Sequence, residues 1–247
     1  MLSKLKKLDE SLQALGLSKD EVLAYWLQEK GIALKHSNGV KEVKYAQWQD
    51  YPVIDWNFGE DDIRSRVDIG WYVFAGGHFS PNKNAYPNCQ GVIGIINDDP
   101  TAEEGERIKI VLRHQKNLKW CEEYIYTKVT DEDNGRENTR RLLEYGKKKG
   151  LCFPAMEFAR DYNFDGVKAG EAYVPAMHEL KKLNKNYEVI HNALRQIGSS
   201  FCSSFGDWHW SSSEFFTDRA LGVRPCGGGL TSFGKDASFA VTCLLDY

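Results

Sequence analysis

The C-terminal part of the sequence, from Phe205 to Phe239, concentrates the side chains best suited to binding a partner. It mixes tryptophan, phenylalanine and arginine with many glycines and serines. Rigid aromatic rings give contact area at a low cost in conformational entropy, and arginine is enriched at interfaces. This composition predicts a recognition surface made by His209, Phe215, Phe216, Asp218, Arg219, Leu221, Arg224, Leu230, Thr231, Ser232, Phe233 and Phe239.

The competing interpretation is that many of these side chains belong to the core, because apolar members of a strand are usually buried. It is the stronger interpretation for Trp210, which begins the run Trp210, Ser211, Ser212, Ser213 and Glu214. We expect the tryptophan to pack inward, while the serine and glutamate side chains hold the loop through hydrogen bonds. This run is therefore predicted to be scaffold.

No metal or cofactor is expected from the remaining polar residues. The segment from Thr130 to Gly135 resembles a calcium loop, but its glycine is one position early for an EF-hand and no glutamate follows at the required offset. A turn and a helix cap before Asn138 account for it. The six cysteines lie far apart, without a C-x-x-C pair or a zinc spacing, so we expect reduced and mostly buried thiols.

The charge of the chain argues against a nucleic-acid partner. It has 35 acidic and 32 basic side chains, and its longest basic cluster, Lys147 to Lys149, closes a helical pattern. No apolar run approaches the roughly 18 residues of a membrane helix, so no membrane insertion is expected. Asp9 and Glu10 stand where a signal peptide would place its apolar core. We expect a soluble protein without a signal peptide.

Hydrophobic periodicity predicts helices and strands in separate parts of the chain. Helices are expected within residues 1–35, at 138–149 with Gly150 as the stop, after Phe153, and from Val174 to Ile197. Antiparallel strands joined by sizeable loops are expected between Lys41 and Lys128, most clearly at 70–74, 91–96 and 108–112. The chain closes with a buried-strand pattern at 239–245.

Several of these segments resemble, in the same order, a bacterial and phage family with a C-type-lectin-like fold. The run from Trp210 to Glu214 resembles its W-S-S-[ST]-E motif, and Gly170 to Leu180 resembles its G-E-x-Y-L-P-[AS]-x-x-E-L segment. Gly70 to Ser80 and Cys89 to Ile96 resemble its opening hairpin and the strand after it. The best-understood members are variable proteins of diversity-generating retroelements, including the phage receptor-binding protein called the major tropism determinant. The family's V-R-x-V ending is replaced here by Val241 to Leu245, and the opening turn lacks its Asp-Gly.

The resemblance implies an α+β fold with two helices beside antiparallel sheets, in which the final strand pairs near the first. It divides the chain into an N-terminal helical segment, residues 1–50, and a C-type-lectin-like domain, residues 51–247, with a variable region at about 205–240. It also implies a non-enzymatic protein that binds a protein or cell-surface ligand, with the N-terminal helices docking to a larger assembly. Such a protein is cytoplasmic or part of a phage virion.

Two alternatives stay open on the same fold. Enzymes of the formylglycine-generating type use two cysteines near the C-terminus, for which Cys226 and Cys243 are the candidates. Against this, Cys243 lies in an apolar strand pattern with no basic residue nearby to lower its pKa. The other alternative is a structural component of a phage particle. Calcium-dependent sugar binding is not expected, because neither a Glu-Pro-Asn or Gln-Pro-Asp loop nor a Trp-Asn-Asp strand occurs.

Overall fold

The structure, a computed structural model, describes residues 54–55, 64, 67–102, 106–201 and 207–247. All of them belong to Val53–Tyr247, the second of the two units into which the chain divides. The helices predicted within residues 1–35 lie outside the described residues. The division of the chain after residue 50 stays a prediction.

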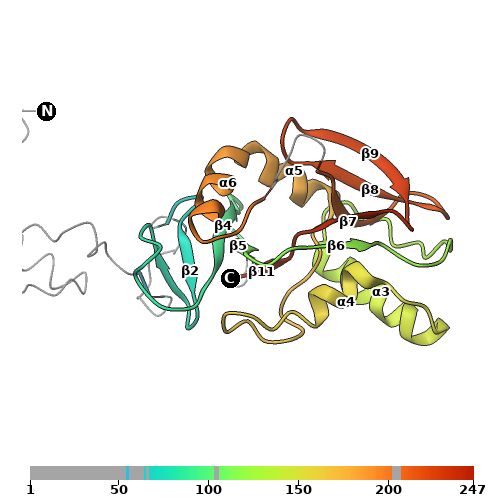
Figure 1. Cartoon of the computed structure of the whole chain (residues 1–247), viewed down its shortest axis with the longest axis horizontal. Helices are drawn as coiled ribbons and strands as arrows, with labels where there is room; N and C mark the ends of the chain where they lie inside the picture. The colour runs from blue at the N-terminus through green and yellow to red at the C-terminus, as the bar shows by residue number, and fades with distance from the viewer. Residues whose placement is uncertain (1–53, 56–63, 65–66, 103–105, 202–206) are drawn as a thin grey trace, which may run out of the picture. The chain divides into compact units, whose positions relative to one another are not determined.

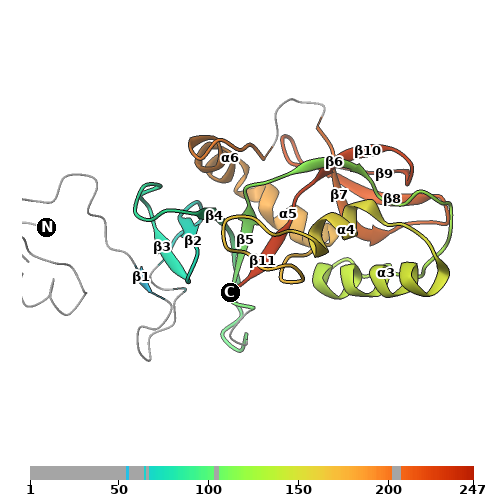
Figure 2. The same cartoon turned by 60° about the horizontal axis from the view of Figure 1, so that its bottom comes forward.

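The strands of the described residues form two sheets. The first is antiparallel and has the order β1 (Ile54–Asp55), β3 (His78–Ser80), β2 (Tyr72–Phe74), β4 (Cys89–Ile96), β5 (Ile108–Leu112) and β11 (Leu244–Asp246). The second has the order β6 (Lys116–Lys119), β10 (Ser238–Val241), β7 (His209–Glu214), β8 (Arg219–Arg224) and β9 (Gly229–Gly234). In the second sheet β10 runs parallel to β7, and the other neighbours are antiparallel. Figure 2 shows this sheet at one end of the unit.

Four helices accompany the sheets in the described part of the chain, which gives it the mixed α+β composition that the sequence predicts. They are α3 (Gly135–Lys149), α4 (Pro154–Arg160), α5 (Met177–Lys185) and α6 (Tyr187–Gln196). Figure 1 shows α5 and α6 on one side of the strands and α3 and α4 on the other. The single helix predicted from Val174 to Ile197 is wrong, because Asn186 leaves the helical conformation at φ −111° and ψ 22° and separates α5 from α6. Asparagine competes for backbone hydrogen bonds and favours such breaks.

Local signals at both ends fix α3. The Asn134 side chain accepts a hydrogen bond from the Glu137 amide (2.9 Å), and Gly150 ends the helix at φ 69°. Before the helix, Asp131 Oδ1 accepts the amide protons of Asp133 (2.7 Å) and Asn134 (3.0 Å). These backbone hydrogen bonds lower the pKa of the Asp131 carboxyl. The segment that resembles a calcium loop is thus a turn and a helix cap, as the sequence predicts.

The longest strand, β4, is buried along almost its whole length and needs glycine at Gly91. A Cβ atom at Gly91 would lie 2.1 Å from the Val111 carbonyl oxygen of β5, closer than any real contact. The neighbouring Val92 and Ile93 side chains are fully buried on opposite faces. This strand therefore contributes to both apolar cores of the unit.

The two cores lie on different sides of the strands. One contains Ile93, Trp120, Phe153 and Trp210, and includes residues of α3 and α4. The other contains residues of α5 and α6, among them Leu180 and Leu194, packed with Val92, Val111 and Leu221. Burial of these apolar side chains supplies the main stabilisation of the unit.

Two stretches of chain cross directly from one sheet to the other. β5 continues into β6 through Arg113–Gln115, and β10 continues into β11 through Thr242 and Cys243. The two crossings are neighbours, because β10 pairs with β6 and β11 pairs with β5. The pattern at 239–245 is therefore two strands in different sheets. The final strand pairs with β5 at the sheet edge opposite β1, which corrects the pairing near the first strand that the resemblance implies.

None of the helices in the described residues has the length and apolar character needed to cross a membrane. Within the same residues, no three His, Cys, Asp or Glu side chains gather in a group that could hold a metal ion.

Candidate functional site

The five residues from Trp210 to Glu214 lie in β7, and all of them are buried. The Trp210 indole N–H donates to the Leu118 carbonyl of β6 (3.0 Å), and Ser213 Oγ donates to the Asp131 carbonyl (2.7 Å). These bonds connect β7 to a neighbouring strand and to the turn before α3. None of the five side chains is available to a partner at the surface.

A buried ion pair lies at the end of β7. The Glu214 and Lys235 side chains are fully buried, and Oε1 of Glu214 lies 2.5 Å from Nζ of Lys235. Nζ also donates to the carbonyls of Ile125 (2.6 Å) and Thr217 (2.9 Å), so all three of its protons are bonded. It lies 4.8 Å from the centre of the Trp120 ring. Burial of two charges is tolerated when such bonds replace the lost water.

The same pair holds three separate segments together. The Glu214 carboxylate accepts the backbone amide protons of Thr127 (2.9 Å) and Lys128 (2.8 Å). Lys235 reaches Thr217 in the β7–β8 turn, and its own amide donates to the Asp218 carbonyl (3.0 Å). Residues 122–128, the β7–β8 turn and the turn after β9 therefore meet at one place. Figure 1 shows the first two extending together at the same end of the unit.

Exposed aromatic side chains gather on these joined segments. The exposed fractions are 57% for Tyr124, 46% for Tyr126, 44% for Phe215 and 57% for Phe216, which are four of the eight large apolar side chains exposed in the described residues. The two phenylalanine rings pack edge to face with centres 4.4 Å apart. We call the exposed side chains of Tyr124, Tyr126, Phe215, Phe216, Asp218 and Arg219 the tip surface.

Charged groups surround the aromatic residues of the tip surface. Arg219 donates from Nη1 to the Ser232 carbonyl (3.1 Å), and its Nε lies 3.9 Å from the Asp218 carboxylate. A hydrogen bond to the Asp236 carboxylate, with a smaller contribution from the Asp218 charge, raises the pKa of the Tyr124 phenol. The tip surface therefore combines aromatic area with an arginine and carboxylates, a composition suited to a protein partner.

The backbone of the β7–β8 turn gives the tip surface a defined shape. The amides of Phe215 and Phe216 both donate to the Arg219 carbonyl (3.0 Å each), and the Arg219 amide donates back to the Phe216 carbonyl (3.3 Å). The turn is thus closed by its own hydrogen bonds and anchored below by Lys235. Ordered backbone lowers the entropy that binding would cost.

Two other predicted binding residues, Arg224 on β8 and Leu230 on β9, lie at the far end of the β8–β9 hairpin. β8 pairs with β9 from Arg219 opposite Gly234 to Arg224 opposite Gly229, so the two arginines are five residues, about 16 Å, apart along the strand. Arg224 lies over the Trp208 ring, 5.7 Å from its centre, and Leu230 is exposed nearby on β9. The structure therefore does not bring Arg224 and Leu230 into the tip surface.

His209 and Leu221 are buried, which is inconsistent with their predicted place on a recognition surface. His209 Nδ1 lies 2.7 Å from Thr242 Oγ1, and its ring packs edge to face on Phe201. Burial lowers the pKa of His209 to about 4, so the ring is neutral at pH 7. Leu221 faces the core beneath α5. Alternation along a strand places each of them on an inward face.

The remaining predicted residues lie on β9 and β10. Thr231 is exposed and Ser232 is partly exposed. Phe233 and Phe239 are half-buried, with ring centres 4.5 Å apart, and Phe239 packs edge to face on Trp210 (4.9 Å). Phe233 and Phe239 therefore fit both the core and the surface interpretation, because each ring packs on the core and remains partly exposed.

Tyr124, Tyr126 and Asp236 are not among the binding residues predicted from the sequence. The two tyrosines lie far from the β7–β8 turn in sequence, and the Glu214–Lys235 pair and the hydrogen bond between Tyr124 and Asp236 bring their segment to it. The sequence feature that could have indicated this site is the presence of two tyrosines, two residues apart, in a segment whose composition is otherwise that of a polar loop.

The cysteine pair of the enzyme alternative is poorly placed for thiol chemistry. Cys243 is fully buried, and burial raises the pKa of its thiol well above the ordinary value. Nucleophilic cysteines need the opposite shift, since the thiolate is the reactive form. Cys226, by contrast, is partly exposed in the β8–β9 turn.

Comparison with known proteins gives a fold likeness. No protein-family model matches the sequence, and no curated protein matches it. The structure is similar to the crystal structure of a fimbrial protein from Bacteroides ovatus ATCC 8483, with a TM-score of 0.58 and 15% sequence identity. The match covers 73% of this chain and 49% of the fimbrial protein, so the chain spans about half the length of that protein. At this identity the similarity is one of fold.

Proposed function

We propose that this chain is a non-enzymatic binding protein, which contacts a protein on a cell or particle surface through the tip surface. The observation that carries the proposal is the gathering of four exposed aromatic side chains with Arg219 on segments joined by the buried Glu214–Lys235 pair. Aromatic and arginine side chains dominate the binding energy of protein interfaces. Leaving such side chains exposed favours self-association, so a binding role explains why they are present.

The scaffold in this proposal is C-type-lectin-like, related to the variable proteins of diversity-generating retroelements. In its favour, the W-S-S-S-E run is buried and bonded, while the turn directly after it is exposed. A diversifiable protein needs this separation, because residues that change must not carry the fold. The pairing of β11 with β5 departs from the arrangement implied by the resemblance.

The absence of catalysis is also part of the proposal. The buried Cys243 thiol argues against the formylglycine-generating alternative. Recognition by the tip surface needs only shape and charge complementarity. The protein would act from a phage particle or within the cytoplasm, with the N-terminal segment as the attachment to a larger assembly. The fimbrial neighbour is compatible with such an assembly.

A binding assay with tip variants tests the proposed surface. Fluorescently labelled full chain is titrated onto a panel of intact bacterial cells, and binding is measured by flow cytometry. For any cell type that binds, the triple variant Tyr124→Ala, Phe216→Ala, Arg219→Ala should bind at least about 100-fold more weakly, because each hot-spot residue contributes about 2 kcal/mol or more.

Leu230→Ala is the matched control, since Leu230 is comparably exposed but lies at the other end of the β8–β9 hairpin. It should bind as the unchanged chain does. Equal binding by the triple variant, with its fold intact by circular dichroism, would remove the tip surface from the proposal.

The encoding DNA tests the relation to diversity-generating retroelements. A near-copy of roughly the last 150 bases beside a reverse transcriptase gene, differing mainly at adenines, is expected. The differing codons should include Phe215, Phe216 and Arg219 and should spare Trp210 to Glu214. Differences concentrated in the buried codons would contradict the proposed division between scaffold and surface.

A further inference from the structure

The second sheet ends at β9, and no strand of the described residues lies beyond it. β9 pairs with β8 along all six of its residues, Gly229–Gly234, without a shift of register. Figure 1 shows β9 at the outer margin of the sheet. An edge strand of this kind presents a row of backbone donors and acceptors to which another strand can pair. The outer edge of β9 is therefore a candidate site for an added strand.

The alternation of hydrogen bonds identifies the backbone groups that β9 directs outward. The Lys235 amide donates to the Asp218 carbonyl (3.0 Å), one position beyond the end of the β8–β9 register. In an antiparallel ladder every second pair of residues is hydrogen-bonded. Counted back from Lys235, Thr231 bonds to β8, whereas Leu230 and Ser232 direct their N–H and C=O groups away from it.

Hydrogen bonds on the other side of β8 agree with this count. The Arg219 carbonyl accepts the Phe215 amide proton (3.0 Å), and the Leu221 carbonyl accepts from Ser211 Oγ of β7 (2.8 Å). Both carbonyls thus point away from β9. Because Leu221 is the register partner of Ser232, these two residues form a pair without hydrogen bonds, and the Ser232 amide faces the outer edge.

The outward groups of β9 are available for new hydrogen bonds. In the described part of the chain no residue accepts from the Leu230 or Ser232 amide, and none donates to the Leu230 carbonyl. The Ser232 carbonyl accepts one bond, from Arg219 Nη1 (3.1 Å), and has a second lone pair. Leu230 is 42% exposed and Ser232 is partly exposed. An antiparallel strand could therefore exchange two hydrogen bonds with each of these residues.

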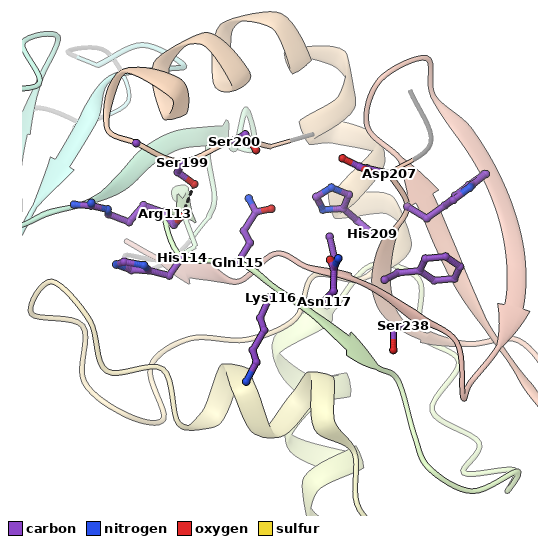
Figure 3. Close-up of a pocket in the computed structure, with 14 residues that line it drawn as sticks. Arg113, His114, Gln115, Lys116, Asn117, Ser199, Ser200, Asp207, His209 and Ser238 are labelled. Carbon is purple, nitrogen blue, oxygen red and sulfur yellow. Dashed lines mark hydrogen bonds between the residues drawn. The ribbon is translucent and has the colours of Figure 1, made fainter. Parts of the chain in front are cut away.

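Two other sheet edges carry features that oppose strand addition. β6, the opposite edge of the same sheet, has Lys116 and Lys119 among its four residues. Figure 3 shows Lys116 extending from this strand beside a cavity of about 770 Å³. The edge of β11 is covered at Leu244, which exchanges two backbone hydrogen bonds with Tyr173 (2.9 and 3.0 Å). β9 itself contains neither a charged residue nor a proline, the usual means of blocking an edge, which favours a binding role.

Arg219 determines the chemistry that an added strand needs. Its side chain begins on β8 and reaches the Ser232 carbonyl, so the guanidinium lies at the outer edge of β9. The side chain is 49% exposed, and its ion pair with Asp218 is long, at 3.9 Å. A carboxylate on the residue opposite Ser232 could accept charge-assisted hydrogen bonds from this guanidinium. The edge therefore favours an extended segment with an acidic side chain at that position.

A second copy of this chain fits the edge less well. Two β9 strands that paired through Leu230 and Ser232 would hold their Ser232 residues about 5–8 Å apart, given a strand spacing of about 4.8 Å and a rise of about 3.4 Å per residue. Each Ser232 carbonyl holds an Arg219 guanidinium, so two positive charges would lie close together and repel each other.

We propose that the outer edge of β9 binds an extended segment of another protein as an added antiparallel strand, with a carboxylate side chain opposite Ser232. Backbone hydrogen bonds to Leu230 and Ser232 supply the affinity, and Arg219 supplies the selectivity for an acidic residue. The Leu230 side chain takes no part, so Leu230→Ala keeps the site. The proposal uses only Arg219 of the tip surface and goes beyond the function proposed above.

A defined peptide tests this site in the full chain. The probe is acetyl-Thr-Val-Thr-Glu-Thr-Val-Thr-amide, and binding is followed by NMR titration of the chain's amides. It should bind with a dissociation constant of about 1 mM or below, and the same peptide with lysine in place of glutamate about fivefold more weakly. Ser232→Pro should weaken binding about tenfold, because it removes the outward amide without removing a bond to β8. Ser232→Ala, which keeps this amide, is the matched control and should bind the peptide as the unchanged chain does.

Amide hydrogen exchange tests the same edge without a variant, so the test does not depend on how Ser232→Pro folds. Without peptide, the Leu230 and Ser232 amides should exchange faster than the Thr231 amide, which bonds to β8. Peptide at ten times its dissociation constant should slow the exchange of Leu230 and Ser232 about tenfold, because bound amides are protected. The exchange of Thr231 should change less.

Four results would overturn the proposal. They are no binding of the glutamate peptide, equal binding of the lysine peptide, full binding by a folded Ser232→Pro variant, and slow exchange of both outward amides without peptide. A dimer of the unchanged chain in sedimentation velocity that Ser232→Pro abolishes would assign the edge to a second copy instead. The peptide assay contains no cells and no aromatic tip variants, so its failure leaves the cell-binding test of the tip surface unaffected.

Discussion

Replacement of Lys235 by methionine tests whether the buried ion pair organises the tip surface. Methionine has a similar length, so the change removes the charge and three hydrogen bonds without leaving a large cavity. It leaves the Glu214 carboxylate, fully buried, without its cation, and the carbonyls of Ile125 and Thr217 without a donor. Removal of one partner of a buried pair costs about 3–5 kcal/mol. Solvent does not screen the interaction between the two charges, because neither side chain is exposed.

The assay is urea unfolding of the full chain at neutral pH, combined with amide hydrogen exchange. Lys235→Met should lose about 3–5 kcal/mol of unfolding free energy. The amides of Thr127 and Lys128, which donate to Glu214, should exchange faster. Adding Glu214→Gln should restore part of the loss, because no charge then remains unpaired. The exposed Lys116→Met is the control and should change stability by less than about 0.5 kcal/mol. A loss below about 1 kcal/mol for Lys235→Met, with unchanged exchange, would refute the reasoning.

Three further changes test other parts of the fold. Burial lowers the pKa of His209 from 6.5 to about 4, so between these two pH values the unfolded chain binds a proton that the folded chain does not. The free energy of unfolding should therefore fall by up to about 1.4 kcal/mol per pH unit as the pH drops through this range. Urea unfolding of His209→Gln should show a flatter pH dependence, and an unchanged slope would contradict the assignment. Gly91→Ala should cost about 3 kcal/mol or more, because its Cβ would meet the Val111 carbonyl at 2.1 Å, and a wild-type melting temperature would show this contact to be absent. Asn134→Ala should cost about 1 kcal/mol in the same unfolding assay, since it removes the cap on the Glu137 amide, and no loss would mean that the cap is not formed.

Local signals in the sequence predict those elements that local chemistry controls. The α3 helix follows from an asparagine cap, an apolar stripe and a glycine stop, which all lie within the helix or beside it. The strand pattern at 91–96 follows from a continuous apolar run. The mixed α+β composition follows from the separation of these patterns along the chain.

Features that depend on distant contacts were beyond the sequence. The apolar pattern at 239–245 would look the same for one long strand as for two short ones, because both β10 and β11 place side chains in a core. For the same reason, the aromatic composition of the tail did not distinguish the exposed Phe216 from the buried His209 and Leu221. Tyr124 joins the candidate site through the Glu214–Lys235 pair, whose partners are 21 residues apart, and through its hydrogen bond to Asp236. Pairing of that kind is a property of the folded chain.

The paired crossings between the sheets have a mechanical consequence. A single strand passing between two sheets can act as a hinge, because rotation about its backbone dihedrals lets the sheets tilt. Here Arg113–Gln115 and Thr242–Cys243 cross side by side, and the Leu112 amide bonds to the Cys243 carbonyl (3.0 Å) between them. Rotation about one crossing is resisted by the other, so the sheets should move as one body. A partner pulling on the β7–β8 turn would therefore load both sheets together, and the two apolar cores should yield in a single cooperative step.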